Sequence, residues 1–195
     1  MKILIGLGNP GRKFQKTRHN LGRLIVNNWK EKHDFPDFKL NKKFKTLISK
    51  DTSRKEKIIL ALPETYMNLS GKSVKSLTTK YKIETINTWV IHDDIDIPLG
   101  KIRIVKNKGA AGHKGVQSII DTMDTKNFIR FRIGIKPKTK DKEQKTRIRN
   151  LDEFVLRKFN KSEEKVLKKI IRESINAIEM ALRTGLEKAM QEYNK

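Results

Sequence analysis

The hydrophobic pattern near the N-terminal end changes from a continuous apolar run to a helical period. Residues 3–7 are apolar apart from one glycine, which predicts a short strand buried on both faces, and Pro10 ends it. From residue 21 to Trp29 the apolar positions recur every three or four residues, which predicts an amphipathic helix. His19 should therefore lie at or just before the first helical turn. There the helix dipole disfavours an imidazolium, unless a carboxylate offsets it.

Strand and helix patterns alternate along the rest of the chain. Residues 44–50 and 57–62 predict a hairpin joined by the turn DTSRKE, and Ser70 is expected to cap the helix that follows. Ser162 is expected to cap a long helix that ends at Gly185 and precedes a short one. Other strands are predicted at 88–91, 101–106 and 129–135, and another helix at 116–123.

This order of elements predicts the fold class. Strands that alternate with helices, together with one hairpin, indicate an α/β fold: a single-domain three-layer sandwich with a mixed β-sheet flanked by helices. No linker rich in glycine, serine or proline divides residues 1–195, so we expect one domain. The loop at 63–68 is expected at the carboxyl end of a strand, where sites of α/β proteins are common.

Charge adds a partner class to this picture. The chain has 45 Lys and Arg against 22 Asp and Glu, a net charge of +23, which favours a polyanion such as nucleic acid. Heavy use of lysine, isoleucine and asparagine is also what AT-rich coding produces, so compositional bias remains an alternative. Residues 136–149 contain seven Lys or Arg, two acids and no apolar period, which predicts a basic flexible flap at about 136–150.

Two further absences restrict the candidate chemistry and location. The chain has no cysteine, which excludes disulfides, thiol catalysis and zinc sites with cysteine ligands. No apolar run is long enough to span a membrane, and the N-terminal pattern is that of a strand rather than a signal peptide. We therefore expect a cytoplasmic protein that has no membrane partner.

Two alternative binding sites fit the sequence poorly. Gly6, Gly8 and Gly11 match G-x-G-x-x-G after a strand, but Pro10 and a polar stretch stand where a dinucleotide site needs a helix to begin. A metal site could combine acids with histidines, but their spacing matches no calcium loop or H-E-x-x-H motif, and we predict no metal. The candidate metal ligands are Asp93, Asp94, Asp96, His19, His92 and His113.

The residue types at the predicted sheet ends suit a hydrolase better. A histidine at a helix start and an aspartate after a strand can form a general base and its partner, and loop asparagines at 9, 20 and 68 can donate to a carbonyl whose oxygen gains charge. The chain contains no G-x-S-x-G motif, and Ser70 and Ser73 are explained by a helix start. A covalent serine mechanism is therefore less favoured.

Six sequence blocks resemble the bacterial-type peptidyl-tRNA hydrolases. They are GLGNPG, TRHNLG, PETYMNLSGKSV, HDDIDIPLGKIRI, GHKGVQSI and FRIGI, in that order, and GLEKAM near the end also fits. The resemblance implies hydrolysis of the ester between a peptide and the 3′ ribose of tRNA, which recycles tRNA from peptidyl-tRNA dropped by stalled ribosomes. It also implies a monomer without metal or cofactor. A non-catalytic RNA-binding homologue, like a plant organelle splicing factor on the same scaffold, is the alternative.

The resemblance also implies roles for individual residues. His19 would activate water, and Asp93 would orient and stabilise its ring. Asn9 and Asn68 would contact the peptide and orient the attack, and Asn9 would help to distinguish blocked peptidyl-tRNA from free aminoacyl-tRNA. The positions expected to line the channel for the peptide and the tRNA 3′ end are Phe14, Tyr66 and Met67, and His113 is also expected to bind the substrate or tRNA.

Two positions depart from the family pattern. Arg132 matches a residue that clamps the tRNA 5′ phosphate, but its expected lysine partner is Val105 here, so Arg103 or Lys106 would have to substitute. After His113 the family usually has asparagine, whereas this chain has Lys114, a charged group that can only donate. Lys114 should lower the pKa of His19, and would either contact the tRNA 3′ end or weaken turnover.

Overall fold

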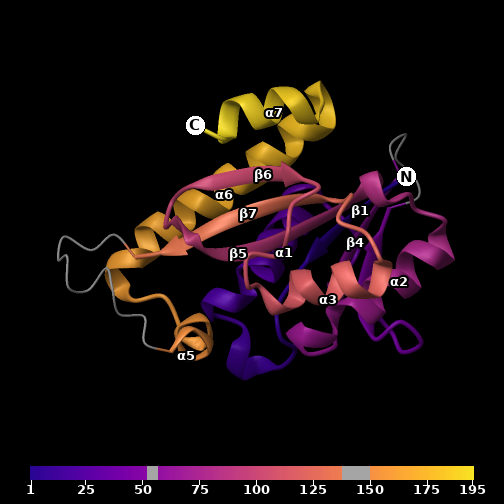
Figure 1. Ribbon diagram of the computed structural model, residues 1–195, viewed down its shortest axis with the longest axis horizontal. Coiled ribbons are helices and arrows are strands. Elements are labelled where there is room, and N and C mark those ends of the chain that lie inside the picture. Colours follow the sequence, from indigo (N-terminus) through magenta and orange to yellow (C-terminus); the bar gives the residue numbers. More distant parts are fainter. Residues whose placement is uncertain (52–56, 138–149) are drawn as a thin grey trace.

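A computed structural model describes residues 1–51, 57–137 and 150–195. Within these residues a seven-stranded sheet has the order β2-β3-β4-β1-β5-β7-β6 (Figure 1). The pairs β1–β4, β1–β5 and β5–β7 are parallel, and β2–β3, β3–β4 and β6–β7 are antiparallel, so the sheet is mixed, as predicted. The strands are β1 (Lys2–Gly6), β2 (Lys39–Asn41), β3 (Thr46–Lys50), β4 (Ile58–Pro63), β5 (Thr88–Pro98), β6 (Ile102–Lys106) and β7 (Ile129–Lys136).

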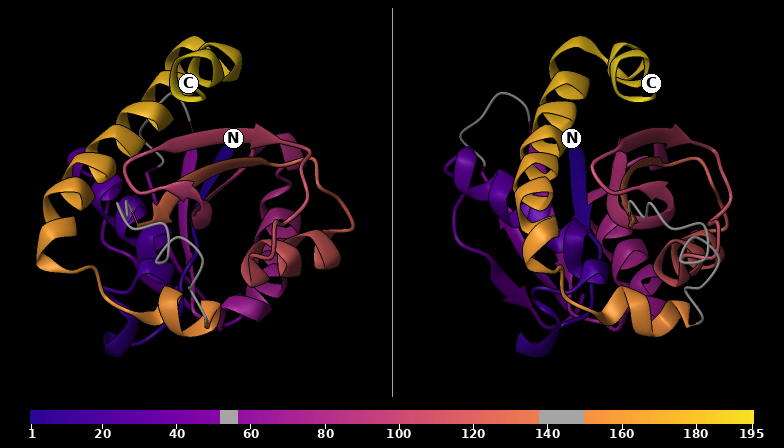
Figure 2. Two further views of the ribbon diagram at one scale, coloured as in Figure 1. Left: turned by 60° about the vertical axis from the view of Figure 1, so that its left-hand side comes forward. Right: turned by 90° about the vertical axis from the view of Figure 1, so that its left-hand side faces the viewer.

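Helices cover both faces of the sheet. Helices α1 and α6 pack on one face and α2 and α3 on the other, which Figure 2 shows edge on. The α-helices are α1 (Leu21–Lys32), α2 (Ser70–Tyr81), α3 (Lys114–Met123), α5 (Leu151–Leu156), α6 (Lys161–Thr184) and α7 (Leu186–Tyr193). Short 3₁₀ turns are η1 (Arg12–Phe14), η2 (Arg18–Asn20), η3 (Met67–Leu69) and η4 (Thr85–Asn87).

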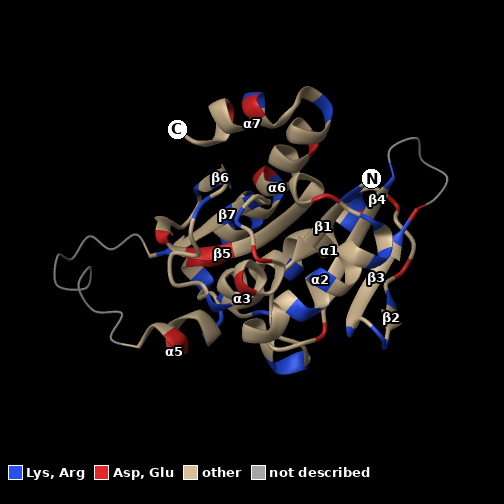
Figure 3. Cartoon of the chain, turned by 45° about the vertical axis from the view of Figure 1, so that its right-hand side comes forward, with Lys and Arg blue, Asp and Glu red and all other residues tan. Residues whose placement is uncertain are grey.

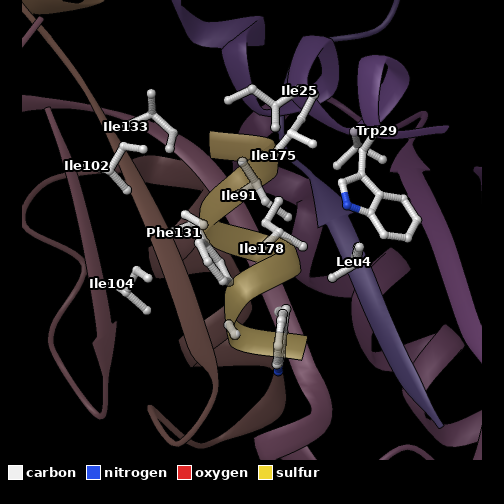
Figure 4. Packing of buried hydrophobic residues seen from close by; sticks show 14 of the residues in the cluster. Leu4, Ile25, Trp29, Ile91, Ile102, Ile104, Phe131, Ile133, Ile175 and Ile178 are labelled. Atoms are coloured by element: carbon white, nitrogen blue, oxygen red, sulfur yellow. The ribbon is translucent and has the colours of Figure 1, made fainter. Parts of the chain in front are cut away.

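Two hydrophobic clusters separate the layers of this three-layer sandwich. Successive strand residues point to opposite faces, so Leu4 and Ile91 join the cluster under α1 and α6. Their neighbours Ile5 and Val90 join the cluster under α2 and α3. Figure 4 shows the first cluster, in which Ile178 of α6 lies among residues of the sheet. The continuous apolar run near the N-terminal end is therefore a central strand covered on both faces.

The glycines of the first motif allow α1 to approach the sheet closely. A Cβ atom at Gly22 would lie 2.1 Å from the Ile91 carbonyl oxygen, and one at Gly8 would lie 2.8 Å from Asn20 Oδ1. The Leu7 backbone N–H donates to the Ile91 carbonyl oxygen at 3.0 Å. A Cβ atom at Gly6 would lie 2.6 Å from the Gly22 carbonyl oxygen, whereas one at Gly11 would meet no atom within 4 Å. Close packing therefore explains Gly6 and Gly8 of the G-x-G-x-x-G pattern, and the positive φ of 100° explains Gly11.

Three elements differ from the sequence prediction. Strand β5 continues to Pro98, so Asp93 lies within a strand, paired in register with Ile133, rather than after one. The pairing with β7 supplies backbone hydrogen bonds, which keep this stretch extended. Its polar side chains lack the hydrophobic pattern that predicts a strand. The sequence analysis also missed the short edge strand β2 and the helix α5.

Two predicted helix caps are wrong. The Ser70 hydroxyl lies inside α2 and donates to the Met67 carbonyl oxygen at 2.8 Å. Helix α6 begins one residue after Asn160, whose Oδ1 accepts from the Glu163 backbone N–H at 3.0 Å while Glu163 Oε2 accepts from the Asn160 backbone N–H at 2.8 Å. This reciprocal capping box is why Asn160, and not Ser162, caps the helix.

Parts of two predictions lie outside the described residues. The turn at 51–56 is described only at its first residue, and residues 138–149 of the basic flap at about 136–150 are not described. No helix in the described ranges has both the length and the apolar character that crossing a membrane requires.

Candidate active site

Three elements bring two histidines to one carboxylate. His19 lies in η2 just before α1, Asp93 in β5, and His113 at the N-cap of α3. The distance from His19 Nδ1 is 3.0 Å to Asp93 Oδ1 and 3.1 Å to Oδ2, and His113 Nε2 lies 3.2 Å from Oδ1. The carboxylate is 2% exposed. The sequence predicted the contact between His19 and Asp93, but not that His113 shares the carboxylate.

The carboxylate determines the tautomer of His19. An ionised carboxylate only accepts hydrogen bonds, so His19 must donate from Nδ1. In the neutral ring the lone pair is then on Nε2. His19 also lines a pocket together with residues of β5, α3 and α5. This is the geometry of a general base whose ring is held by a buried acid.

His113 is held in the opposite tautomer. Its Nδ1 accepts hydrogen bonds from the backbone N–H groups of Gly115 and Val116, at 3.1 and 3.2 Å, so its proton is on Nε2 and is donated to Asp93. His19, Asp93 and His113 are close enough together to be considered as metal ligands. A metal ion would need a lone pair on His113 Nε2. That nitrogen carries the proton, because Nδ1 accepts the two hydrogen bonds from the start of α3. The donor chemistry therefore does not fit a metal ion.

The two charges of the pair stabilise each other. Burial alone would lower the pKa of His19, but the carboxylate of Asp93 outweighs burial and raises it above the ordinary value of 6.5. Burial would likewise raise the pKa of Asp93, but the charge of His19 and the hydrogen bonds from both histidines hold it well below its usual range. The carboxylate that could offset the helix dipole is thus present.

His92, the third histidine of this region, has a structural role. It is fully buried in β5, and its Nδ1–H donates to the Asp93 carbonyl oxygen at 2.6 Å. Burial, reinforced by the neighbouring His113, places the pKa of His92 well below its ordinary value. The ring therefore stays neutral and helps to fix the backbone that carries Asp93.

An amide network orients Asn9. The side chain of Asn20 accepts from the Asn9 backbone N–H at 2.8 Å and donates to the Asn9 carbonyl oxygen at 2.9 Å. Asn9 Oδ1 accepts from the Met67 backbone N–H at 2.8 Å. This last bond identifies the oxygen of the Asn9 amide, so Nδ2 is the group that can donate to a substrate. Asn20, predicted to donate to a substrate carbonyl like Asn9 and Asn68, instead holds the backbone of Asn9.

The other predicted substrate residues differ in exposure. Asn68 and Tyr66 are exposed on either side of Met67, which is only 4% exposed. Met67 packs on α3, since a Cβ atom at Gly115 would lie 2.3 Å from its sulfur. Phe14 in η1 is half-buried, with the Lys13 ammonium 4.9 Å from its ring centroid. Only Met67 among the three predicted lining residues is thus tied to the site by contacts described here.

Helix α5 closes one side of the pocket. Leu151, Asp152 and Val155 line it together with Lys114 and His113. Lys114 Nζ donates to Asp152 Oδ2 at 2.6 Å, although both side chains are more than half exposed. Asp152 raises the pKa of His19 and Lys114 lowers it, as predicted for Lys114. Lys114, which stands where the family usually has asparagine, is therefore paired with Asp152 of α5.

Arg18 attaches the segment after α5 to the turn that carries His19. Its guanidinium donates to the Lys158 carbonyl oxygen at 2.6 Å and to both carboxylate oxygens of Glu163, at 2.9 and 2.6 Å. It also lies over the ring of Phe154, 4.5 Å from the centroid. Sequence reasoning missed this contribution, although Asn150 followed by Glu153 is a helix start signal that could have predicted α5.

Arg132 lies near the site on β7, and its Nε–H donates to Asp94 Oδ2 at 2.7 Å. In the antiparallel β6–β7 pair Arg103 is directly opposite Arg132, so both side chains are on one face. Strand alternation places Lys106 on the other face. The sequence left open whether Arg103 or Lys106 accompanies Arg132, and the strand register places Arg103 beside it.

Comparisons with known proteins agree with this geometry. A family model described as peptidyl-tRNA hydrolase matches residues 3–195. Peptidyl-tRNA hydrolases of Thermodesulfovibrio yellowstonii and Fusobacterium nucleatum are 39% and 41% identical over 100% of this chain, and over 100% and 97% of their own lengths. The crystal structure of the Acinetobacter baumannii peptidyl-tRNA hydrolase, at 29% identity, covers 100% of this chain and 94% of its own with a TM-score of 0.86. This chain belongs to the peptidyl-tRNA hydrolase family.

Proposed function

We propose that this protein hydrolyses the ester between a peptide and the 3′ ribose of tRNA, and so returns tRNA from peptidyl-tRNA that stalled ribosomes have dropped. The observation that carries the proposal is the His19 imidazole bound through Nδ1 to buried Asp93, together with the fixed amide of Asn9, whose backbone is held by the side chain of Asn20. An intact base and its acid are what hydrolysis needs, and no contact among residues 1–51, 57–137 and 150–195 favours a non-catalytic RNA-binding role.

In this reaction Nε2 of His19 removes a proton from water, and the resulting hydroxide attacks the ester carbonyl carbon. The imidazolium is stabilised by Asp93. When the tetrahedral intermediate collapses, the bond to the ribose 3′ oxygen breaks and the imidazolium returns its proton to that oxygen. The products are a free peptide carboxylate and tRNA, and the chemistry requires no cofactor.

Amide groups stabilise the developing oxyanion in this proposal. Asn9 Nδ2 is a neutral donor whose orientation is fixed, and such preorganised donors act on the charge that develops in the transition state. Asn68, two residues after the exposed ring of Tyr66, donates to the peptide. Phe14, Tyr66 and Met67 line the path of the peptide and the tRNA 3′ end.

The tRNA phosphates bind on the other side of β5. Arg132 clamps the 5′ phosphate together with Arg103, which the strand register places beside it, rather than with Lys106. Binding of a polyanion by these groups and the basic flap releases counterions, so affinity falls with salt. A monomeric, cytoplasmic enzyme is part of the proposal. The family resemblance implies the monomer, and a cysteine-free sequence suits a reduced cytosol.

The proposal is tested by incubating the native protein with N-acetylaminoacyl-tRNA and with free aminoacyl-tRNA. We expect release of the N-acetylated amino acid from the first substrate, and much slower cleavage of the second. Full activity in excess chelator should accompany the first result, since no step uses a metal. Tight tRNA binding without any ester cleavage at high protein concentration would instead support the RNA-binding alternative.

Replacing Lys114 with asparagine is expected to change kcat/KM by less than about fivefold, because an exposed ion pair contributes only about 0–1 kcal/mol. Lys114 lowers the pKa of His19, so its removal should move the acid limb of the pH–rate profile slightly to higher pH. The measurement is kcat/KM for N-acetylaminoacyl-tRNA between about pH 5 and 9, within which a histidine base titrates.

A change above about tenfold would contradict this account. A gain of that size would mean that the ammonium occupies the position of the attacking water, and a loss would mean that it contacts the tRNA 3′ end. Replacing Gln117, an exposed residue of α3 whose amide donates to Asp121, with alanine is the matched control, because it changes the same helix without altering its charge.

A further inference from the structure

A hollow beside α2 is lined mainly by lysines and hydroxyl groups. It lies where one face of α2 meets the turn before β3 and the end of α3. Its floor is the ring of Phe44, which is 8% exposed. The other lining residues are Lys43, Lys72, Lys75, Ser76, Thr79, Lys80 and Thr122. No carboxylate lines this hollow, which we call the lysine hollow.

The four ammonium groups of the lysine hollow are not neutralised within the described part of the chain. All four lysines are exposed, and none has a carboxylate within ion-pair distance there. Lys72 and Lys75 are three residues apart on α2, which has no acidic residue along its length (Figure 3). Side chains at that spacing are neighbours on a helix. The hollow is therefore a concave, uncompensated cationic surface.

Strand β5 lies between the strands that carry Arg132 and Arg103 and the strand that leads into α2. In the sheet order β2-β3-β4-β1-β5-β7-β6, Arg132 and Arg103 are on β7 and β6, to one side of β5. Strand β4 is on the other side and leads through Met67 directly into α2. If the tRNA phosphates bind at the arginines, the peptide leaves toward α2. Tyr66, 59% exposed, and Leu69, 40% exposed, lie in the segment between β4 and α2.

The distances suit the part of the peptide nearest the ester. At about 1.5 Å per helical residue, Lys72 and Lys80 lie about 6 and 18 Å along the chain direction from Asn68. An extended peptide advances about 3.4 Å per residue. Peptide residues about two to five positions beyond the one that Asn68 contacts therefore reach the lysine hollow.

We propose that the lysine hollow is a peptide subsite that selects acidic side chains, so that this enzyme prefers peptidyl-tRNAs with aspartate or glutamate a few residues before the ester. The inference rests on the proposed function and names the substrate class within it. Carboxylates of the peptide pair with Lys43, Lys72 and Lys75, while its apolar parts contact Tyr66, Leu69 and the ring of Phe44.

The test compares three N-acetylated hexapeptidyl-tRNAs that share one tRNA and one alanine at the ester. The remaining positions are aspartate, serine or lysine, and kcat/KM is measured at low and high salt. The native enzyme should hydrolyse the aspartate substrate about tenfold faster than the lysine substrate, since each exposed pair contributes up to about fivefold. The difference should shrink at high salt, and the serine substrate should lie between.

Two charge-reversed variants locate the effect. Lys72→Glu with Lys75→Glu should reverse the order of the aspartate and lysine substrates and leave the serine substrate nearly unchanged. Lys165→Glu with Lys168→Glu on α6 makes the same charge change at the same spacing on an exposed helix surface, and should keep the native order.

Three results would overturn the inference. The native enzyme could treat the three peptides alike, or the α6 variant could alter the order as much as the α2 variant. Equal loss on all three substrates in the α2 variant alone would mean that the lysine hollow contacts RNA. Failure of native protein to cleave even the serine substrate would refute the proposed function itself, whereas cleavage of all three at one rate would refute only the acidic subsite.

Discussion

Replacing His19 with alanine is expected to lower kcat/KM for N-acetylaminoacyl-tRNA by about 10²–10⁴-fold, the range that a positioned general base contributes. The loss should appear in kcat more than in KM, because the imidazole acts on water and contributes little to tRNA binding. Folding should persist, since Asp93 keeps its hydrogen bond from His113. Single-turnover rates and thermal unfolding of the variant provide the measurement.

His33 is the matched control for this change. Its ring stacks on Trp29 at 4.1 Å and its Nε2 pairs with Glu179, on the face of the molecule covered by α1 and α6. His33→Ala removes an imidazole without touching Asp93, so activity should stay near the native level. Retention of more than about a tenth of native activity in His19→Ala would show that another group activates the water.

Replacing Asp93 with asparagine is expected to lower kcat/KM by about 10²-fold or more, and to move the acid limb of the pH–rate profile to lower pH. In the native protein Asp93 raises the pKa of His19 above 6.5, so the free base is lost as pH falls through a value above the ordinary one. Without the charge, burial lowers that pKa. The carboxamide oxygen can still accept from His19, so the change removes charge while keeping size.

Asp96→Asn provides the comparison, because Asp96 is an exposed acid on the same strand. Its pH profile should match the native one. The stability of the two variants should differ as well. The pKa of Asp93 is held well below 3.8, so its contribution to stability is present above that pH and is lost as pH falls. An unchanged acid limb in Asp93→Asn would mean that the limb does not report the His19–Asp93 pair.

Local patterns predicted most elements because a buried strand and an amphipathic helix have distinct hydrophobic periods. The run at residues 3–7, the helix from Leu21 and the hairpin around β3 and β4 are all present. The two main errors have different causes. The polar end of β5 is extended because β7 pairs with it, which is a tertiary contact. The capping box of Asn160 and Glu163 takes the place expected for Ser162, and it is a local signal that the sequence does contain.

For the site, sequence motifs identified His19, Asp93, Asn9 and His113 as candidates and indicated the family. They did not give the direction of any hydrogen bond. The α3 cap assigns the His113 proton to Nε2, and the Met67 N–H assigns the oxygen of Asn9. Nor did they indicate that Lys114 is paired, because Asp152 is 38 residues away in the chain and belongs to a helix the periodicity did not reveal.

The amino-acid order alone thus established the α/β architecture, the basic character and the chemical types available for an ester hydrolysis. Only the tertiary structure decided which nitrogen of each histidine carries a proton, that Arg103 lies opposite Arg132, and that the lysines of α2 surround a hollow without acids. The reason is physical. The hydrophobic pattern that distinguishes a strand from a helix is a property of residues close together in the chain. Which histidine nitrogen is protonated, and which charges pair, depends on groups that folding brings together from distant segments.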